Sequence, residues 1–498
     1  MTLGASLPLL ILLSSLIPGI VIFFLSEEQH RVRTALNMLG ATVKIILVVI
    51  LIWGVFSGNE FESRFRLLPG LDLVLHADAL SVLFVTLSTV LWFVTTLYAI
   101  GYLEGAPHRS RFFGFFSLCV SATIGIAMAG NLLTFLIFYE ILTLSTYPLV
   151  VHRGTPEALQ AGKIYLVYTL SGGVILLAGV AWLRALAGPL DFTETGILAG
   201  RSDLNPTTLK IIFLMLIAGL GVKAALVPLH GWLPKAMVAP APVSSLLHAV
   251  AVVKAGAFGI ARVVYDVYGV EFAAKLDLLF PLAVAAAFTI IYGSVRALFQ
   301  DELKKRLAYS TISQVSYIAL GVATIGPVAT IGGIVHLVHQ GVMKITLFFC
   351  AGNFAETLGI HHISEMHGVG RRMPWTMTAF TIGALGMIGV PPIAGFISKW
   401  YLASGALEAN QTWVLAVLAG SSLLNAAYFL PILYVAWFKP QQHPWPEERG
   451  YPNHETALAL LIPPLFTAAA ALLIGLLAAA PFSPLEWAQL IAQREYHQ

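Results

Sequence analysis

The chain has 498 residues, of which 58% are hydrophobic and only 11% are charged. Soluble globular domains carry about 25% charged residues, so this composition indicates a membrane protein. The formal net charge of +3 gives no sign of a nucleic-acid partner. The two cysteines, Cys119 and Cys350, lie in apolar stretches and indicate neither a disulfide framework nor a metal cluster. The sequence has no nucleotide or flavin motif, and we expect no cofactor on this chain.

Apolar runs of about 18–25 residues recur along nearly the whole chain, and each is long enough to cross a bilayer of about 30 Å. We therefore expect an all-α polytopic membrane protein with about fourteen transmembrane helices. The first run has no basic segment before it, so it should be a membrane helix and not a signal peptide. The expected spans are residues 5–25, 34–56, 78–102, 112–129, 132–150, 160–186, 208–228, 242–262, 277–298, 306–325, 329–352, 376–405, 411–436 and 454–480.

The polar gaps between these spans are short, so residues 1–498 should form a single transmembrane domain. Within it, we expect N-terminal helices over 1–110, a first repeat over 111–262, a second repeat over 277–436 and a C-terminal helix over 454–480. Lys and Arg are more frequent in the loops of one side. The positive-inside rule then predicts both termini outside an inner (cytoplasmic) membrane of a bacterial or archaeal cell.

Two of the spans carry proline close to a lysine. In the seventh, Pro228 follows Lys223 by five residues, and in the twelfth, Pro391 and Pro392 precede Lys399 by about two turns. Proline removes a backbone donor and clashes with the preceding turn, so both helices should be broken inside the membrane. Broken helices in corresponding positions of two halves are typical of inverted-repeat transporters. The fourth to eighth spans should therefore correspond to the ninth to thirteenth as two inverted five-helix repeats.

Six ionisable residues other than histidine lie inside the strongly apolar stretches of the chain. A charge near the bilayer centre costs about 2.5–3.5 kcal/mol, so the whole set left unpaired would cost on the order of 15 kcal/mol. They must face the protein interior, pair with one another or touch water, and such a row is typical of proteins that move ions or protons. The six are Lys44, Glu140, Lys223, Lys254, Lys344 and Lys399.

Glu140 has no charged neighbour on either adjacent turn of its span. It could make a purely structural hydrogen bond, but a carboxylate in an apolar helix normally needs a cation, and Lys223 is the natural partner. Lys44 is different, because it can snorkel to the interface or meet Glu27 or Glu28 from the preceding loop. We leave Lys44 out of any pathway.

Three histidines share these spans with the lysines. His248 and Lys254 are six residues apart, which places them on different sides of one helix. His248 is either a satisfied core histidine or, with Lys254, part of a relay. His336 and His339 share one helix face, with Lys344 about 80° further around. They could hold a metal, but no third ligand lies near in sequence, so we favour a relay and expect no metal.

A set of short segments between about residues 138 and 399 stands in one order and spacing: Phe138-Tyr-Glu140, Val222-Lys223, Pro228-Leu-His-Gly-Trp-Leu-Pro234, Ala241-Pro-Val-Ser-Ser-Leu-Leu-His248, Asp301-Glu-Leu-Lys-Lys-Arg-Leu-Ala-Tyr-Ser-Thr311, Pro391-Pro392 and Gly395-Phe-Ile-Ser-Lys399. This set resembles the proton-translocating antiporter-like subunits shared by respiratory complex I, membrane-bound hydrogenases and Mrp-type sodium/proton antiporters. Lys rather than Glu at position 399 is most similar to the D subunit of Mrp antiporters or the corresponding hydrogenase subunit.

The resemblance implies a role for each half of the row. Glu140 and Lys223 would be the ion pair that gates protonation. Lys254, with His248, would be the central relay. A structural hydrogen bond for Glu140 and a satisfied core position for His248 stay open as alternatives.

In the second half, the resemblance implies that His336 and Lys344 continue the relay. Lys399 would be the terminal group near the far-side exit, unless it only snorkels from a helix end. Gln340 stands where many relatives have histidine, so His339 or water would have to replace that group. Lys235 replaces a common acidic residue.

The function implied is that of the proton-conducting subunit of a multi-subunit monovalent cation (Na+)/proton antiporter. Its partners would be other integral membrane subunits, the lipid bilayer, protons and Na+. The alternative is a proton-pumping membrane subunit of a redox-driven complex, with the redox centres on partner chains. A third class is a structural membrane subunit, or one that couples protons to another solute.

Overall fold

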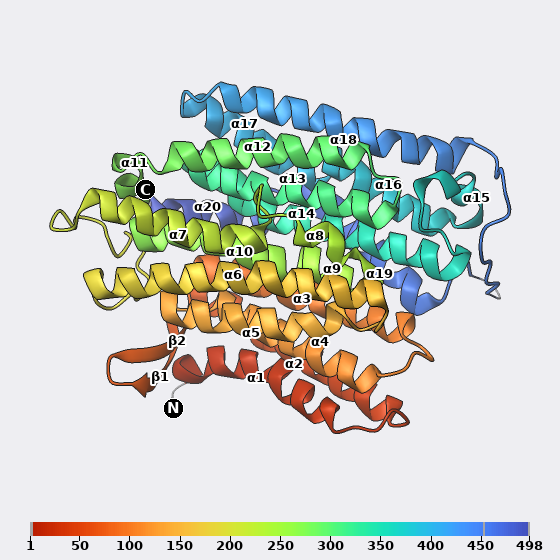
Figure 1. Ribbon diagram of the computed structural model, residues 1–498, viewed down its shortest axis with the longest axis horizontal. Helices are drawn as coiled ribbons and strands as arrows, with labels where there is room; N and C mark the ends of the chain where they lie inside the picture. The colour runs from red at the N-terminus through yellow and green to blue at the C-terminus, as the bar shows by residue number, and fades with distance from the viewer. Residues whose placement is uncertain (1–2, 452–453, 497–498) are drawn as a thin grey trace.

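The computed structural model describes residues 3–451 and 454–496, and its long helices lie side by side with nearly parallel axes (Figure 1). Within the described residues, 12 helices are long and apolar enough to cross a membrane. The shorter or more polar α13, α16 and α17 occupy the places of the tenth and twelfth expected spans. The predicted all-helical polytopic fold is therefore confirmed. In chain order the helices are α1 (Leu3–Phe23), α2 (His30–Phe56), α3 (Ala79–Tyr102), α4 (Arg109–Ala127), α5 (Leu132–Val150), α6 (Pro156–Ala187), α7 (Pro206–Ala224), α8 (Trp232–Lys235), α9 (Ala241–Ala249), α10 (Val252–Arg262), α11 (Val270–Lys275), α12 (Leu279–Leu298), α13 (Leu303–Ala323), α14 (Pro327–Leu358), α15 (Val369–Arg372), α16 (Pro374–Ile388), α17 (Ala394–Glu408), α18 (Trp413–Phe438), α19 (Leu458–Leu476) and α20 (Pro484–Glu495).

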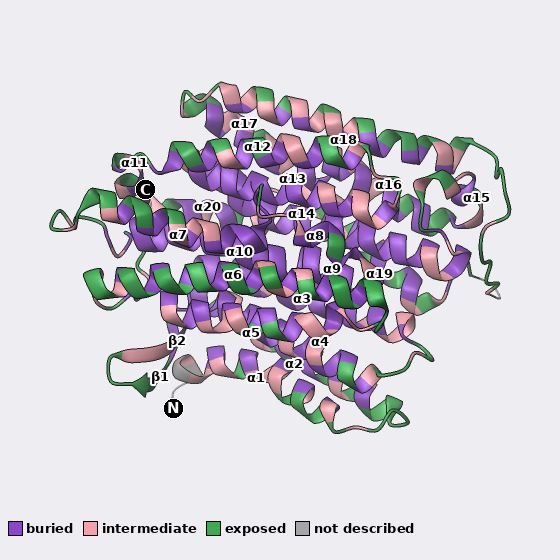
Figure 2. Cartoon of the chain, in the orientation of Figure 1, coloured by how far each residue is buried: buried purple, intermediate pink, exposed green. Residues whose placement is uncertain are grey.

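The bundle is built around α14 and the α9–α10 segment. In the most apolar windows of Ala241–Tyr268 and Pro327–Leu358, 100% of the residues are buried, against 39% in α6 and 33% in α18. Figure 2 shows the buried residues concentrated in the middle of the molecule, while α18 and α6 expose one side. The central helices therefore offer an environment without lipid contact, and the outer helices supply the apolar faces that lipid or partner chains cover.

Both predicted breaks near a lysine are present. Helix α7 ends at Ala224, Ala225 takes a left-handed conformation (φ 57°), and helix resumes only at Trp232. Helix α16 ends before Gly389, whose φ of 100° suits a residue without a side chain, and α17 begins at Ala394. Each break therefore leaves the carbonyl groups of a helix end inside the protein.

The predicted single helix over 242–262 is wrong in one respect, because the structure divides it into α9 and α10 at Val250 and Ala251. No proline or glycine marks this break. The β-branched residues around it are weak helix formers, and Gly341 of α14 packs against the carbonyl of Ala249 there. His248 and Lys254 consequently lie on two helices, and the rotation expected for one helix does not apply to them.

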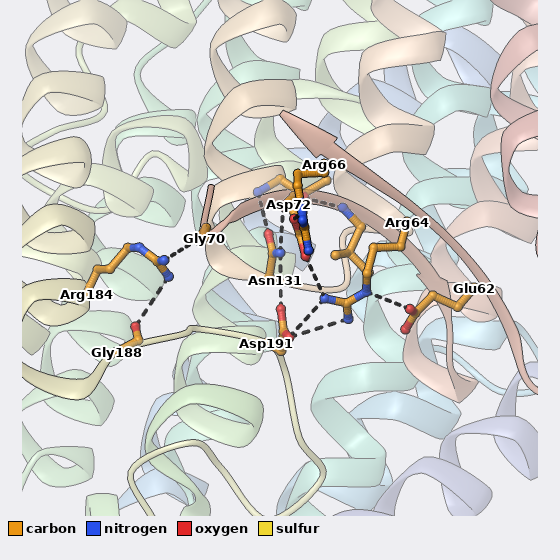
Figure 3. A network of polar contacts seen from close by, with 11 residues as sticks. Glu62, Arg64, Arg66, Gly70, Asp72, Asn131, Arg184, Gly188 and Asp191 are labelled. Carbon is orange, nitrogen blue, oxygen red and sulfur yellow. Dashed lines mark hydrogen bonds and ion pairs between the residues drawn. The ribbon is translucent and has the colours of Figure 1, made fainter. Parts of the chain in front are cut away.

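A two-stranded antiparallel hairpin, β1 (Phe61–Leu68) and β2 (Leu71–Ala77), fills part of what we expected to be a polar gap. Figure 3 shows Arg64 of the hairpin between Glu62 and Asp191, with nitrogen–oxygen distances of 2.9 and 3.3 Å. Arg184 at the end of α6 donates to the carbonyl of Gly70 in the hairpin turn. These contacts fix the hairpin over the loop that follows α6.

Helix α20 was not expected either, and it lies near the hairpin end of the bundle (Figure 1). Its Trp487 indole donates to the carbonyl of Ala79 at 2.7 Å. The start of α1 lies at this same end (Figure 1). The two ends of the described chain thus share one side, while the side of the membrane that this represents stays a prediction.

Replacement of Gly256 by alanine should lower the thermal stability of the protein. A Cβ at Gly256 would lie 2.2 Å from the backbone nitrogen of Ala224, so α10 would have to move away from α7. Overpacking of this kind costs about 1–3 kcal/mol. Thermal unfolding of the purified protein in detergent measures the effect.

The matched control is Gly420→Ala in α18, where the nearest atom to the new Cβ is 3.8 Å away. Alanine is a better helix former than glycine by about 1 kcal/mol, so this variant should keep or raise the unfolding midpoint. Equal midpoints for the two variants would contradict the close α7–α10 contact.

Candidate functional site

The predicted site residues lie in a row that crosses the bundle through α5, α7, α9, α10, α14 and α17. Figure 1 shows these helices side by side with nearly parallel axes, so a row that passes from one to another runs across the helix axes. Glu140 and Lys399, at its two ends, are half-buried. The members between them have a relative exposure of 0% or 1%: Lys223, His248, Lys254, His336, His339 and Lys344.

At the first end, Lys223 stands on the last turn of α7, just before the helix break. Its ammonium donates to the backbone carbonyl of Tyr139 in α5 and lies 3.2 Å from the centroid of the Tyr139 ring. The Tyr139 hydroxyl donates back to the carbonyl of Gly219 at 3.1 Å. Tyr139 therefore contacts the Lys223 amine with both its backbone carbonyl and its aromatic ring.

The expected direct ion pair between Glu140 and Lys223 is not formed. No hydrogen bond or ion pair joins the two side chains in the described part of the chain; the ammonium donates to the carbonyl of Tyr139. The carboxylate instead packs against α6, where a Cβ on Gly173 would lie 2.3 Å from Oε1. This oxygen is buried and has no hydrogen-bond partner among the described residues. Glu140 is thus one residue along the helix from the group that binds Lys223.

The central lysine is bound to the middle of α14. Lys254 of α10 donates to the carbonyl of Leu337 at 2.7 Å. Leu337 directly follows His336, so the contact brings Lys254 to the neighbouring residue of the next ionisable group. Among the described residues, no hydrogen-bonded side chain joins Lys254 to Lys223; the backbones of their helices meet at Gly256 and Ala224.

From α14 the row continues through two side chains that we did not predict. His336 Nδ1 lies 2.8 Å from the hydroxyl of Ser398 in α17. The His336 ring stacks on the ring of Tyr317 in α13, with 5.1 Å between the centroids. The Lys399 ammonium lies 5.5 Å from the centroid of the Tyr317 ring. Tyr317 therefore separates His336 from Lys399, and Ser398 precedes Lys399 in the chain.

Lys399 does not snorkel. Its ammonium donates to the carbonyls of Met387 and Ile388, at 3.0 and 2.8 Å, and to the hydroxyl of Ser422 at 2.9 Å. The two carbonyls belong to the last turn of α16, where the negative end of the helix dipole favours a cation. The break in the twelfth span thus builds the binding site for this lysine.

The other members lie beside this line. Lys344 donates to Ser310 of α13 at 2.5 Å, and His248 stacks on Phe348 of α14 at 4.5 Å. Neither ring nitrogen of His339 makes a hydrogen bond of normal geometry to the described protein, and the same holds for the side-chain amide of Gln340. Buried polar groups in this state cost about 1–3 kcal/mol each, and internal water is their usual partner.

Sequence reasoning missed Tyr139, Tyr317, Ser310 and Ser398. Three of them stand next to or within segments quoted for the family resemblance, which is the signal that could have found them. Tyr317 lies outside these segments. A tyrosine in an apolar helix gives no sign of which ring face will meet a cation on another helix.

The sequence-based placement of Lys44 is wrong. It has an exposure of 0% and reaches neither the interface nor Glu27 or Glu28. Its ammonium donates to Ser15 of α1 at 2.6 Å and lies 4.5 Å from the centroid of the Trp92 ring.

The fold and its buried charges define a polytopic integral membrane protein of the ion-translocating class. The family described as "NADH:quinone oxidoreductase/Mrp antiporter, TM" matches residues 129–425. A second match, to the family described as "NADH-Ubiquinone oxidoreductase (complex I), chain 5 N-terminus", covers residues 70–113. The chain belongs to this family of proton-translocating membrane subunits.

Three relatives illustrate its breadth. The N subunit of NADH-quinone oxidoreductase from Desulforudis audaxviator (strain MP104C) is 34% identical over 418 residues, 82% of each chain. The D subunit of the Na(+)/H(+) antiporter from Bacillus subtilis (strain 168) is 27% identical over 473 residues, 94% of this chain and 93% of that protein. A chain of the membrane-bound sulfane sulfur reductase (MBS), an archaeal respiratory membrane complex, matches with a TM-score of 0.87 and 25% identity, covering 100% of this chain and 99% of that one.

The ring of Tyr317 gives a direct test of this geometry. Tyr317→Leu should reduce proton translocation by the assembled complex about tenfold or more, because it removes the aromatic face between His336 and Lys399. Tyr317→Phe keeps the ring and should stay within about twofold of the wild-type rate, since the hydroxyl makes no hydrogen bond of normal geometry. Proton uptake into vesicles measures both, and equal rates for the two variants would contradict the role of the ring.

Proposed function

We propose that this chain conducts protons along the membrane midplane through its row of buried ionisable groups. The observation that carries the proposal is the sequence of close groups in the second half of the row: Lys254 donates to the carbonyl of Leu337, the neighbour of His336, and the Tyr317 ring lies between His336 and Lys399. The proposed path is Glu140, Lys223, Lys254, then His336 with Lys344, and finally Lys399, with His248 and His339 beside it.

In this mechanism each lysine exchanges its proton while a neutral acceptor holds the amine in place: a backbone carbonyl for Lys223, Lys254 and Lys399, and the Ser310 hydroxyl for Lys344. Movement of the Glu140 carboxylate toward Lys223 would compete with the carbonyl of Tyr139 for the ammonium. That movement changes the charge near Lys254, and with it how readily Lys254 holds its proton. Water must complete the path between Lys223 and Lys254, because no side chain of the described residues joins them by hydrogen bonds.

We propose further that the proton flow drives a monovalent cation, Na+, in the opposite direction within a complex of several membrane subunits. The support is the match to the D subunit of the Bacillus subtilis Na(+)/H(+) antiporter, which extends over 94% of this chain and 93% of the relative. This chain would be the proton-conducting member of the complex.

The second candidate is a proton-pumping subunit of a redox-driven complex. It is supported by the 34% identity to the N subunit of NADH-quinone oxidoreductase and by the fold match to a chain of the sulfane sulfur reductase. In that case, partner chains would carry the redox centres and supply the driving force.

Removal of either charge at the first end should abolish transport. Glu140→Ala and Lys223→Ala in the assembled complex should each reduce proton transport in everted vesicles to background, because each removes a group that the path needs. The matched control is Lys235→Ala, since Lys235 is exposed and lies outside the row. Wild-type transport by either site variant would refute the proposed roles of Glu140 and Lys223.

The same preparation can distinguish the two candidate driving forces, a cation gradient and electron transfer. Purified native complex, reconstituted in vesicles without any electron donor, should exchange protons for Na+ when a Na+ gradient is imposed. Exchange that occurs only with a redox substrate, together with iron–sulfur or flavin chains in the purified complex, would favour the second candidate.

The proposed location is the inner membrane of a bacterial or archaeal cell, with both ends of the chain outside. This orientation places the loop that contains Arg153 inside and the β1–β2 hairpin outside, as the distribution of Lys and Arg predicts.

A further inference from the structure

The N-terminal helices contain a buried amine that the proposed relay does not use. Lys44 of α2 carries three N–H donors; one goes to Ser15, and the ammonium also faces the ring of Trp92. Helices α1 and α3 contain no Asp, Glu, Lys or Arg, and the two arginines of α4 lie in its first turn. Lys44 is therefore a buried amine without a carboxylate partner on the helices that surround it.

Lys44 lies at the end of a polar stripe on the buried face of α2. Arg33 and Asn37 point to the same side of the helix as Lys44, within about 40°. All three have an exposure of 2% or less. The rise of about 1.5 Å per residue places Lys44 about 16 Å from Arg33 along the helix, which is roughly half of a 30 Å bilayer.

Hydroxyl groups of two neighbouring helices follow this stripe. Ser117 of α4 donates to the Asn37 amide oxygen at 3.4 Å. One turn further along α4, Ser121 lies 2.8 Å from Ser15 of α1, and Ser15 accepts from Lys44 at 2.6 Å. Three helices thus bring polar atoms to one line through an otherwise apolar bundle.

The other end of the line lies beside a charged loop. Arg33 donates to the Ser110 hydroxyl at 2.7 Å, and the carboxylate of Glu27 accepts from the backbone N–H groups of Arg109 and Ser110 at 2.9 and 3.1 Å. Partial burial would raise the pKa of Glu27, but these backbone donors and the arginines outweigh it and lower the pKa. The Glu27 side chain is 45% exposed, so an ionised group in contact with water lies at this end of the line.

Two buried polar atoms along this line have no partner in the described protein. They are the Asn37 amide nitrogen on the stripe and the indole nitrogen of Trp92, whose ring faces the Lys44 ammonium. Apolar side chains would pack the same space at a lower desolvation cost. A lysine that served only to join helices does not account for unpaired donors beside it, whereas a hydrated path does.

We propose that Lys44 is a proton-binding site at the blind end of a half-channel between α1, α2 and α4, which opens at the Glu27–Arg33 loop. This half-channel is separate from the relay, because α3 lies between α2 and the central helices α9 and α14. The expected effect of Lys44 on transport rests on the proposed function, because a proton on Lys44 places a charge one helix away from the relay.

The path itself can be tested without any transport assay. Ser117→Cys, made in the complex with Cys119 and Cys350 replaced by alanine, should react with the water-soluble reagent 2-aminoethyl methanethiosulfonate. The matched control is Val120→Cys, which lies at a similar depth in α4 and is fully buried in the apolar core. Faster reaction of Ser117→Cys supports the half-channel, while equal reactivity of the two cysteines would overturn it.

The role of the amine needs a second measurement. Lys44→Met keeps most of the side-chain volume, and Asn37→Leu blocks the stripe while it leaves Lys44 in place. Both should slow proton transport at least fivefold in vesicles with normally assembled complex, and Lys44→Arg should restore part of the rate. Wild-type rates for both variants would overturn the role of Lys44. If Glu140→Ala transported protons at the wild-type rate, the proposed relay would be wrong. The cysteine experiment would still test the half-channel, because it does not depend on transport.

Discussion

The desolvation of buried amines is the constraint on which this structure depends. Four lysines, Lys44, Lys223, Lys254 and Lys344, have no exposed surface inside a membrane bundle. None of them has an ion-pair partner in the described residues; backbone carbonyls or serine hydroxyls hold each amine instead. Each amine is therefore held in position by neutral acceptors.

Broken helices supply part of this ligation. In an intact helix, the carbonyl groups already accept from residues four positions ahead, and only the last turn has free acceptors. The end of α16 delivers two such carbonyls to Lys399. Glycine allows the close contacts around the row: Gly173 gives room to the carboxylate of Glu140, and Gly256 lets α10 touch α7. Backbone geometry and side-chain chemistry are therefore parts of one site.

The sequence predicted those features that have a strong local cause. Span length follows from bilayer thickness, and the breaks after Lys223 and before Lys399 follow from proline. The break between α9 and α10 has no proline or glycine at it, so hydropathy alone could not find it. The hairpin was overlooked because its alternating residues lie in a segment too polar to count as a span.

The site shows the same division. The identity of the buried charges could be read from the sequence, because any ionisable residue in an apolar span needs an explanation. Their partners could not, because Tyr139, Leu337 and Tyr317 are ordinary residues that become ligands only through packing. For Lys44 the prediction was wrong. We expected it to snorkel to the interface or to meet Glu27 or Glu28, but it is fully buried and donates to Ser15.

The most direct test of the central claim is a map of the native complex at a resolution that shows ordered water. The account predicts a hydrogen-bonded file of water molecules between the amines of Lys223 and Lys254. It also predicts water on the unpaired nitrogens of His339. A dry, closely packed gap between those two lysines in an actively transporting preparation would contradict it.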